Sequence, residues 1–134
     1  MQYRIALILC LLCLSNTLHA EREAFTLPNG DRYEGDFVDG VLSGSGVYEW
    51  ADGDRYEGQF SNDLPNGTGT YFWADGRRYD GEFVAGKRQG YGSLTWVNGD
   101  RYEGAFLANQ MHGEGTFLWG NGDRYEGDFI ANQR

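Results

Sequence analysis

The sequence predicts an all-β fold assembled from repeated β-hairpins. The main observation is a motif, Asp54–Phe60, that recurs along the chain. Its tyrosine stands at Tyr33, Tyr56, Tyr79, Tyr102 and Tyr125, each 23 residues after the last. A fixed period between roughly 20 and 50 residues indicates a repeat array. Two further observations, ring residues at alternate positions and regular Asx-Gly dipeptides, indicate that each unit is a hairpin.

Each repeat contains two segments with the alternation of a β-strand. In the second copy, Tyr56, Gly58 and Phe60 share one parity, as do Gly69, Tyr71 and Trp73 at the other end of the repeat. Successive side chains of a strand point to opposite faces. We therefore expect large rings on one face and a solvated, charge-balanced row of Glu, Arg, Thr and Ser on the other. Counted from the tyrosine, positions 3, 12 and 14 are always Gly, and we expect all three to lie on the ring-bearing face.

Two kinds of link join these strands. One contains Asn-Gly or Asp-Gly, the strongest short hairpin signal; these dipeptides are Asn29-Gly30, Asp52-Gly53, Asp75-Gly76, Asn98-Gly99 and Asn121-Gly122. The other, positions 6 to 12, differs between copies, as Ser61–Gly67 and Val84–Gly90 show. We expect a longer, variable loop there, in which binding specificity could be encoded.

The array divides into a half repeat, four full repeats and a partial repeat. These are residues 25–32, then 33–55, 56–78, 79–101 and 102–124, then 125–134 within an array spanning 21–134. The prediction is a meander of one leading strand, four hairpins and one trailing strand. The trailing strand would leave unpaired backbone groups that invite a homodimer. The alternative is that this chain stops short of its natural end.

Residues 1–20 have the pattern of a secretory signal peptide. A basic lead with Arg4 precedes the apolar run Ile5–Leu14, and a polar tail ends at Ala20. An apolar run of that length is too short for a spanning helix. We expect cleavage after Ala20 and export to the periplasm or the outside of the cell. The alternative is a lipid anchor on Cys10 or Cys13, the only cysteines in the chain.

The charge balance excludes one class of partner. The chain has a formal net charge of −9, and residues 21–134 contain 20 acidic and 10 basic side chains, a net charge of −10. Such a chain is repelled at long range by nucleic acid and by anionic membranes. We therefore expect no nucleic-acid partner, and only weak binding to phospholipid.

The repeat resembles the MORN (membrane occupation and recognition nexus) repeat. The resemblance rests on the Tyr, Gly, Phe, Gly, Gly, Trp, Gly and Arg positions, which match in register in four copies. Asp63 and Asn109 depart from it at position 8, where Gly40 and Gly86 stand, and Arg77 replaces the usual Asp. The resemblance implies an elongated, single-layer antiparallel meander of the exported bacterial type, used as a scaffold without catalysis; phospholipid binding has been attributed to such arrays.

Two groups of residues are candidate sites. The first is an aromatic interaction face, which is either the core or a surface for an apolar peptide or a sugar: Tyr33, Phe37, Trp50, Tyr56, Phe60, Trp73, Tyr79, Phe83, Trp96, Tyr102, Phe106 and Trp119. The second is a basic cluster that could bind an anionic group: Arg77, Arg78, Lys87 and Arg88.

Enzymatic and metal-binding functions have little support in the sequence. Asp52-Gly53-Asp54 offers fewer oxygens than the roughly six to eight that Ca²⁺ prefers. His112 has no second His or Cys after residue 20, so it does not predict a zinc site. We expect no cofactor and no catalysis. The predicted function is a scaffold that binds an unknown protein; the alternative is a phospholipid- or carbohydrate-binding module.

Overall fold

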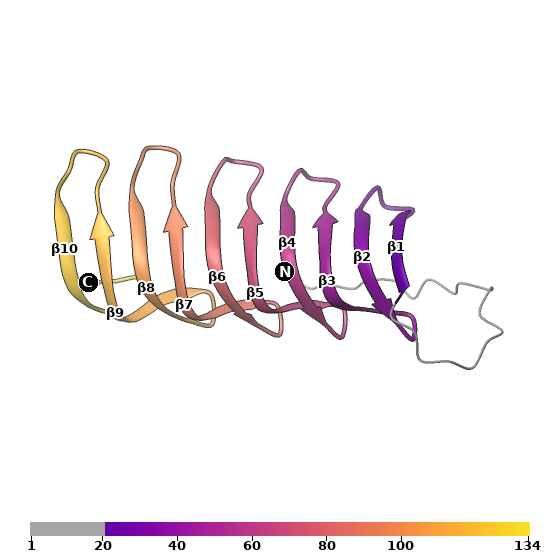
Figure 1. Ribbon diagram of the computed structural model, residues 1–134. Coiled ribbons are helices and arrows are strands. Elements are labelled where there is room, and N and C mark those ends of the chain that lie inside the picture. Colours follow the sequence, from indigo (N-terminus) through magenta and orange to yellow (C-terminus); the bar gives the residue numbers. More distant parts are fainter. Residues whose placement is uncertain (1–20) are drawn as a thin grey trace.

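The computed structural model describes residues 21–134, so the predicted signal peptide, with Cys10 and Cys13, lies outside the described residues. The strands are β1 (Glu21–Thr26), β2 (Arg32–Val38), β3 (Val41–Glu49), β4 (Arg55–Ser61), β5 (Leu64–Phe72), β6 (Arg78–Val84), β7 (Lys87–Thr95), β8 (Arg101–Leu107), β9 (Gln110–Leu118) and β10 (Arg124–Phe129). They pair antiparallel in chain order as one open sheet (Figure 1). The predicted all-β, elongated, single-layer meander of ten strands is confirmed.

Tyrosine and phenylalanine rings form a continuous ladder on one side of the sheet, which we call the ring face. From Phe60 onward, each phenylalanine of the ladder lies edge-on between the tyrosine of its own repeat and that of the preceding one. Phe83, for example, is 5.1 Å from Tyr79 and 5.1 Å from Tyr56, with interplanar angles of 88° and 81°. Edge-to-face pairs contribute roughly 0.5–1.5 kcal/mol each beyond their buried area. The core of this one-layer protein is therefore the ladder itself.

Each tyrosine lies across two glycines of its hairpin. Gly81 and Gly92 pair across β6 and β7. A Cβ on Gly81 would lie 2.6 Å from the Cα of Gly92 and 2.6 Å from the Tyr79 hydroxyl oxygen. That hydroxyl donates to the carbonyl of Glu82 at 2.9 Å, and burial raises the pKa of Tyr79 to about 12, so it stays protonated. The predicted placement of positions 3 and 14 on the ring face is confirmed.

The glycines at position 12 do not follow that prediction. These residues, Gly44, Gly67, Gly90 and Gly113, all have φ between 82° and 101°. They lie in a β-bulge, since Gly81 pairs with Gly92 whereas Phe83 pairs with Arg88. A Cβ on Gly90 would collide with the Glu82 carboxylate, on the side of the sheet opposite the rings, which we call the polar face. Bulges bend strands, and Figure 1 shows each hairpin curving toward its lower end.

The second link is much shorter than predicted. It is a two-residue turn at residues 39–40, 62–63, 85–86, 108–109 and 131–132, with φ between 48° and 81° at both positions. Positive φ at both central residues is the signature of a type I′ turn. The next strand resumes at Leu64 in the second repeat, so most of the predicted loop Ser61–Gly67 belongs to β5. The expectation of a long, variable loop is wrong.

The second residue of this turn docks on the preceding hairpin. The Asp63 N–H donates to the carbonyl of Leu42 at 3.1 Å, and the Leu42 N–H donates to the Asp63 carboxylate at 2.8 Å. Gly86 makes only the first of these bonds, with Pro65. Proline has no N–H to donate, so no side-chain acceptor is needed there. Position 8 therefore holds Asp63 where the facing residue, Leu42, has an N–H to donate, and Gly86 where the facing residue is Pro65.

The Asx-Gly links form hairpin loops, as predicted. In the loop after β3, the Trp50 N–H donates to the Asp54 carbonyl at 2.9 Å and the Gly53 N–H to the Trp50 carbonyl at 3.0 Å. Gly53 has a φ of 100°, which a side chain would disfavour. These loops form the edge of the array that lies uppermost in Figure 1, here called the loop edge.

Aspartates at the loop edge tie successive hairpins together. The Asp54 carboxylate accepts a 2.7 Å bond from the Tyr71 hydroxyl and a 2.8 Å bond from the Ala74 N–H. Asp31 is bound in the same way one repeat earlier. Burial opposes ionisation of Asp31, but hydrogen bonds from backbone and side-chain donors outweigh it and hold the pKa below its usual value. These ties add polar contacts between repeats to the packing of the rings.

Within residues 21–134, one junction lacks this tie entirely, and the next one keeps only the backbone bond, from the Gly120 N–H to Asp100 at 2.8 Å, because Phe117 has no hydroxyl. Between the second and third repeats, Arg77 replaces the aspartate and Leu94 replaces the tyrosine. Arg77 instead forms an ion pair with Asp75, with Nε and Oδ2 2.8 Å apart. Both partners of the tie have changed together, so the junction loses two hydrogen bonds without burying an unpaired hydroxyl.

Restoring the tie should strengthen this junction. We expect the double variant Arg77→Asp with Leu94→Tyr to raise the free energy of unfolding by about 1–2 kcal/mol, because it adds a hydrogen bond to a carboxylate. Leu94→Tyr alone should destabilise, since its hydroxyl would have no carboxylate to bind. Urea unfolding of the two single variants and the double variant measures the coupling energy. Additive single effects would contradict the assignment of the tie.

Candidate functional site

The structure divides the twelve predicted interaction residues into core and edge. Tyr33, Tyr56, Phe60, Tyr79, Phe83, Tyr102 and Phe106 are at most 4% exposed. Phe37 packs against this core at the first repeat. The buried rings contact one another and present almost no surface to a partner. They are the core, which was one of the two interpretations of the aromatic rows.

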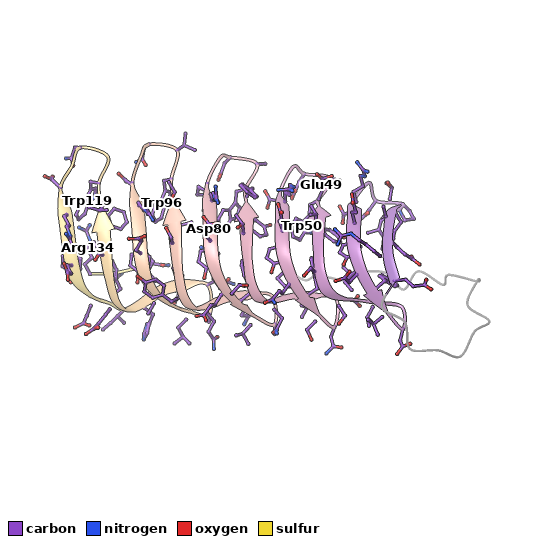
Figure 2. The ribbon with its side chains drawn as sticks, in the orientation of Figure 1. Glu49, Trp50, Asp80, Trp96, Trp119 and Arg134 are labelled. Atoms are coloured by element: carbon purple, nitrogen blue, oxygen red, sulfur yellow. The ribbon has the colours of Figure 1, made fainter. Side chains whose placement is uncertain are left out.

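The four tryptophans, Trp50, Trp73, Trp96 and Trp119, are the accessible part of the ring face. All four are only partly buried; the first three pack against the core, and Trp119 lies against Phe117 and beneath the Arg134 guanidinium. Figure 2 labels Trp50, Trp96 and Trp119, all near the loop edge. Trp73 lies 4.7 Å from the ring of Tyr71, and Trp119 lies 4.8 Å from that of Phe117. Because strands are about 4.8 Å apart, neighbouring indoles recur roughly every 9.6 Å. We call this set the tryptophan row.

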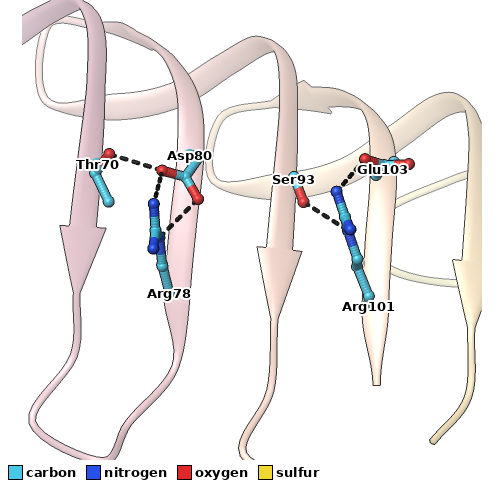
Figure 3. A network of polar contacts seen from close by, with 6 residues as sticks. All are labelled: Thr70, Arg78, Asp80, Ser93, Arg101 and Glu103. Carbon is cyan, nitrogen blue, oxygen red and sulfur yellow. Dashed lines mark hydrogen bonds and ion pairs between the residues drawn. The ribbon is translucent and has the colours of Figure 1, made fainter. Parts of the chain in front are cut away.

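The predicted basic cluster is not brought together. Arg78 lies on the polar face, where its Nε and Nη2 each donate to Asp80 at 2.8 Å. Thr70 donates to the same carboxylate at 2.7 Å (Figure 3). Lys87 is exposed and directly precedes Arg88 in β7, so the two side chains leave the sheet on opposite faces. Of the four residues, Arg77 and Arg88 remain close to the ring face.

Arg77 and Arg88 meet at one indole. Their guanidinium carbons lie 4.7 Å and 5.3 Å from the centroid of the Trp73 ring. Arg88 extends over Phe106 as well, at 5.6 Å, and its Nη2 donates to the carbonyl of Asn109 at 2.7 Å. A shallow groove of about 320 Å³ follows this contact, and its lining includes Pro65, Tyr71, Trp73, Phe83, Arg88 and Asn109, with Lys87 at its border. It combines flat apolar surfaces with a guanidinium and an amide.

The polar face is a row of exposed ion pairs. Arg55 and Glu57 lie 2.8 Å apart, and Arg101 contacts both Glu103 and the Ser93 hydroxyl (Figure 3). More than a third of each charged side chain in these pairs is exposed, so solvent screens the attraction. Such pairs contribute roughly 0–1 kcal/mol each. The polar face therefore has the features of a solvated surface.

Several residues of the groove, among them Tyr71, Pro65 and Asn109, were absent from the predicted site. Pro65 stands at position 10 of its repeat and Asn109 at position 8. Position 10 of one repeat faces position 8 of the next, so Pro65 faces Gly86 and Arg88 faces Asn109. The Arg88 N–H donates to the Asn109 side chain at 2.9 Å, as Leu42 does to Asp63. The only sequence signal for the contact between positions 10 and 8 was that the repeat with Pro65 at position 10 is followed by one with Gly86 at position 8. This signal does not identify a contact by itself.

Within the described chain, no three His, Cys, Asp or Glu side chains are placed to hold a metal ion. Residues 21–134 also contain no helix of the length and hydrophobicity that crossing a membrane requires.

Comparison with known proteins agrees with the hairpin geometry. The family model of the MORN repeat matches residues 33–55, 56–77, 79–101 and 102–124. These segments coincide with the four predicted repeats, except that the second match ends at Arg77, one residue earlier. No curated protein matches the chain. The matched segments cover more than half of the sequence, and each begins with the tyrosine of the ring ladder. The chain therefore belongs to the MORN repeat family.

Proposed function

We propose that the protein is a non-catalytic repeat scaffold that binds a protein partner in an exported compartment. MORN repeats are common in binding and scaffold proteins and are generally non-catalytic. The main support is the tryptophan row, in which all four of the bulkiest side chains stay partly exposed while most of the smaller rings are buried. Tryptophan is enriched among the residues that contribute most to protein interfaces. The pattern of residues 1–20 supports the export.

The shape of the row favours an extended partner. Residues 21–134 form a single-layer sheet, so within this part of the chain no second layer covers the ring face (Figure 1). Three intervals of roughly 9.6 Å separate the first indole from the last, about 29 Å in total. An extended segment of about nine residues has that length. Such a segment, lying across the strands, would contact all four repeats.

The alternative functions have weaker support. Phospholipid binding through the four basic residues would require Arg78 and Lys87 to act with Arg77 and Arg88, and the strands direct them to different faces. Carbohydrate binding is favoured by one observation, the regular spacing of partly exposed indoles, because sugars stack on aromatic rings. Release of a bound protein by soluble oligosaccharides would favour this second candidate.

The proposal is tested with a pair of variants at adjacent positions. Trp96 belongs to the tryptophan row, whereas Val97 is 72% exposed in the following loop. We expect the full chain to capture a protein from the exported fraction. Trp96→Gln should reduce this capture about tenfold, as loss of a central interface residue does, and Val97→Gln should leave it unchanged.

Quantitative mass spectrometry of the captured protein measures the effect, and circular dichroism confirms that both variants are folded. Equal capture by the two variants would contradict a role for the tryptophan row. Undiminished binding of the captured protein to the double variant Trp96→Gln with Trp119→Gln would also contradict a role for the tryptophan row.

A further inference from the structure

Arg88 is the one charged residue among the ring-facing positions of β2–β10; on β1, at the end of the array, Glu21 and Glu23 also share this face. The ring-facing positions of β2–β10 are 1, 3, 5, 10, 14 and 16 of each repeat. They hold Tyr, Gly, Phe, Leu, Pro or Met throughout, with Arg88 as the single charged exception. Its counterparts at position 10 are Leu42, Pro65 and Met111. A guanidinium at such a position loses hydration, and the core does not need it for packing, because aliphatic residues fill the same place elsewhere.

Arg77 is the second exception, and it lies at the same indole. Every other copy has an aspartate at this position, so the local charge changes from negative to positive. Asp75 holds the Arg77 Nε at 2.8 Å, which fixes the guanidinium 4.7 Å from the Trp73 ring. Among residues 21–134, the terminal nitrogens of Arg77 have no hydrogen-bond partner, and 37% of the side chain is exposed. A fixed guanidinium with outward donors suits a planar acceptor.

Two unusual cations therefore converge on Trp73 in a chain whose net charge is −9. The terminal nitrogens of the stacked Arg77 guanidinium are available to a carboxylate, and Arg88 adds a second positive charge at the same indole. The neighbouring groove is lined by Pro65, Tyr71 and Phe83, which are largely buried, and by the partly exposed Trp73 indole. The combination suits a group that has one carboxylate on a flat or apolar body.

We propose that the junction between the second and third repeats binds a carboxylate carried by an otherwise apolar protein segment. This inference refines the proposed function, because it specifies one acidic residue in the partner segment opposite Trp73. A polyanion fits less well, since the other charges of the array are mostly acidic and repel it at long range. A single carboxylate in an apolar segment avoids most of that repulsion while it pairs with Arg77 and Arg88.

The four tryptophans provide the readout. Each gives one indole N–H signal in a ¹H–¹⁵N spectrum of the full chain, assigned by single Trp→Phe variants. The probes are benzoate and its neutral counterpart benzamide, followed by the peptides acetyl-Leu-Glu-Leu-amide and acetyl-Leu-Gln-Leu-amide. We expect benzoate and the Glu peptide to shift the Trp73 signal in a saturable way, at concentrations at least about tenfold lower than their neutral counterparts, as a charge-assisted hydrogen bond predicts.

The chain provides natural variants for this test. Arg88→Met copies Met111, and Arg77→Asp copies the residue of the other repeats; each should weaken binding of the acidic probes at least about fivefold. Arg78→Gln, on the polar face, is the matched control and should leave binding unchanged. If Arg88→Met perturbs the fold, Arg88→Lys keeps the charge but loses the planar donors and should weaken binding in part.

Three results would overturn the inference. One is an equal response of all four indoles to benzoate, which indicates general ring contact. Another is equal affinity for the acidic and neutral probes. The third is displacement of benzoate by phosphatidylglycerol vesicles but not by the Glu peptide, which assigns the site to lipid. This readout needs no partner protein, so a negative result would contradict the carboxylate site without contradicting the scaffold function. Failure of the capture experiment with Trp96→Gln would in turn contradict the role of the tryptophan row without contradicting the carboxylate site.

Discussion

Replacing Gly81 with valine is expected to lower the free energy of unfolding by about 3 kcal/mol or more, the range of severe overpacking. The added Cβ would lie 2.6 Å from the Cα of Gly92 and 2.7 Å from the carbonyl oxygen of Tyr91, both of them backbone atoms that cannot rotate away. The Tyr79 ring would also have to move, and with it the hydrogen bond of its hydroxyl to Glu82.

Glu82→Val is the matched control for this change. Glu82 is the next residue of β6 and lies on the polar face, where its carboxylate accepts a 2.6 Å bond from the exposed Tyr91 N–H. Loss of that bond should cost about 1 kcal/mol, and valine is favourable in a strand. Chemical denaturation monitored by circular dichroism compares the two. Equal loss of stability would contradict the assignment of faces in β6.

The second large effect is expected for Tyr79→Ala, which should cost about 3–5 kcal/mol, as other large-to-small changes of aromatic core residues do. Tyr79 is fully buried and contacts Phe83 and Phe106 edge-to-face, at 5.1 Å and 5.0 Å. Its removal therefore breaks the ladder in the middle and leaves both phenylalanines with a cavity. Tyr79→Phe, which keeps the ring, should cost only about 1 kcal/mol for the lost hydrogen bond.

Tyr125→Ala serves as the comparison at the end of the ladder. Tyr125 makes the same contact with the phenylalanine of its own strand, Phe129, at 5.3 Å, but it is only partly buried. We expect its replacement to cost less than half as much as that of Tyr79. The measurement is the unfolding midpoint in urea at constant slope, which reports stability alone. Similar midpoints for the two alanine variants would argue against a continuous ladder.

The order of the strands and the two faces of the sheet could be predicted because the same alternation of residues recurs in every repeat. The parity of Tyr56, Gly58 and Phe60 is the same in every copy, so chance alternation is excluded. The Asx-Gly dipeptides located one set of links for the same reason. Antiparallel neighbours joined by such short links must pair in chain order, which gave the ten-strand meander without any long-range information.

The bulge could not be predicted, because glycine is compatible with several backbone conformations. Gly90 has the parity of the ring face, yet its φ of 92° turns it out of the regular pleat. Parity arguments assume a regular strand, and one bulge breaks that assumption. The turn at residues 85–86 was missed for a related reason, since Ala85 has a positive φ of 48°, which few non-glycine residues adopt.

The candidate site was predicted only in part. Closeness in sequence suggested a cluster of four basic residues, but adjacent residues of a strand leave on opposite faces. Lys87 and Arg88 differ for this reason, and Arg77 differs from Arg78 because it lies in the loop before β6. The long Arg88 side chain then extends over Trp73, a residue of the preceding hairpin, and the sequence gives no indication of that direction.

Each strand of this sheet pairs only with its neighbours in the chain. The length of the array can therefore change in whole repeats. A 23-residue unit can be inserted or deleted without creating any new kind of contact, because every hairpin meets the next through the same ladder and turn. Each unit changes the length of the tryptophan row by roughly 9.6 Å. Gene duplication of single units could therefore fit the row to partners of different length in steps of about three extended residues, while stability grows by neighbouring interfaces.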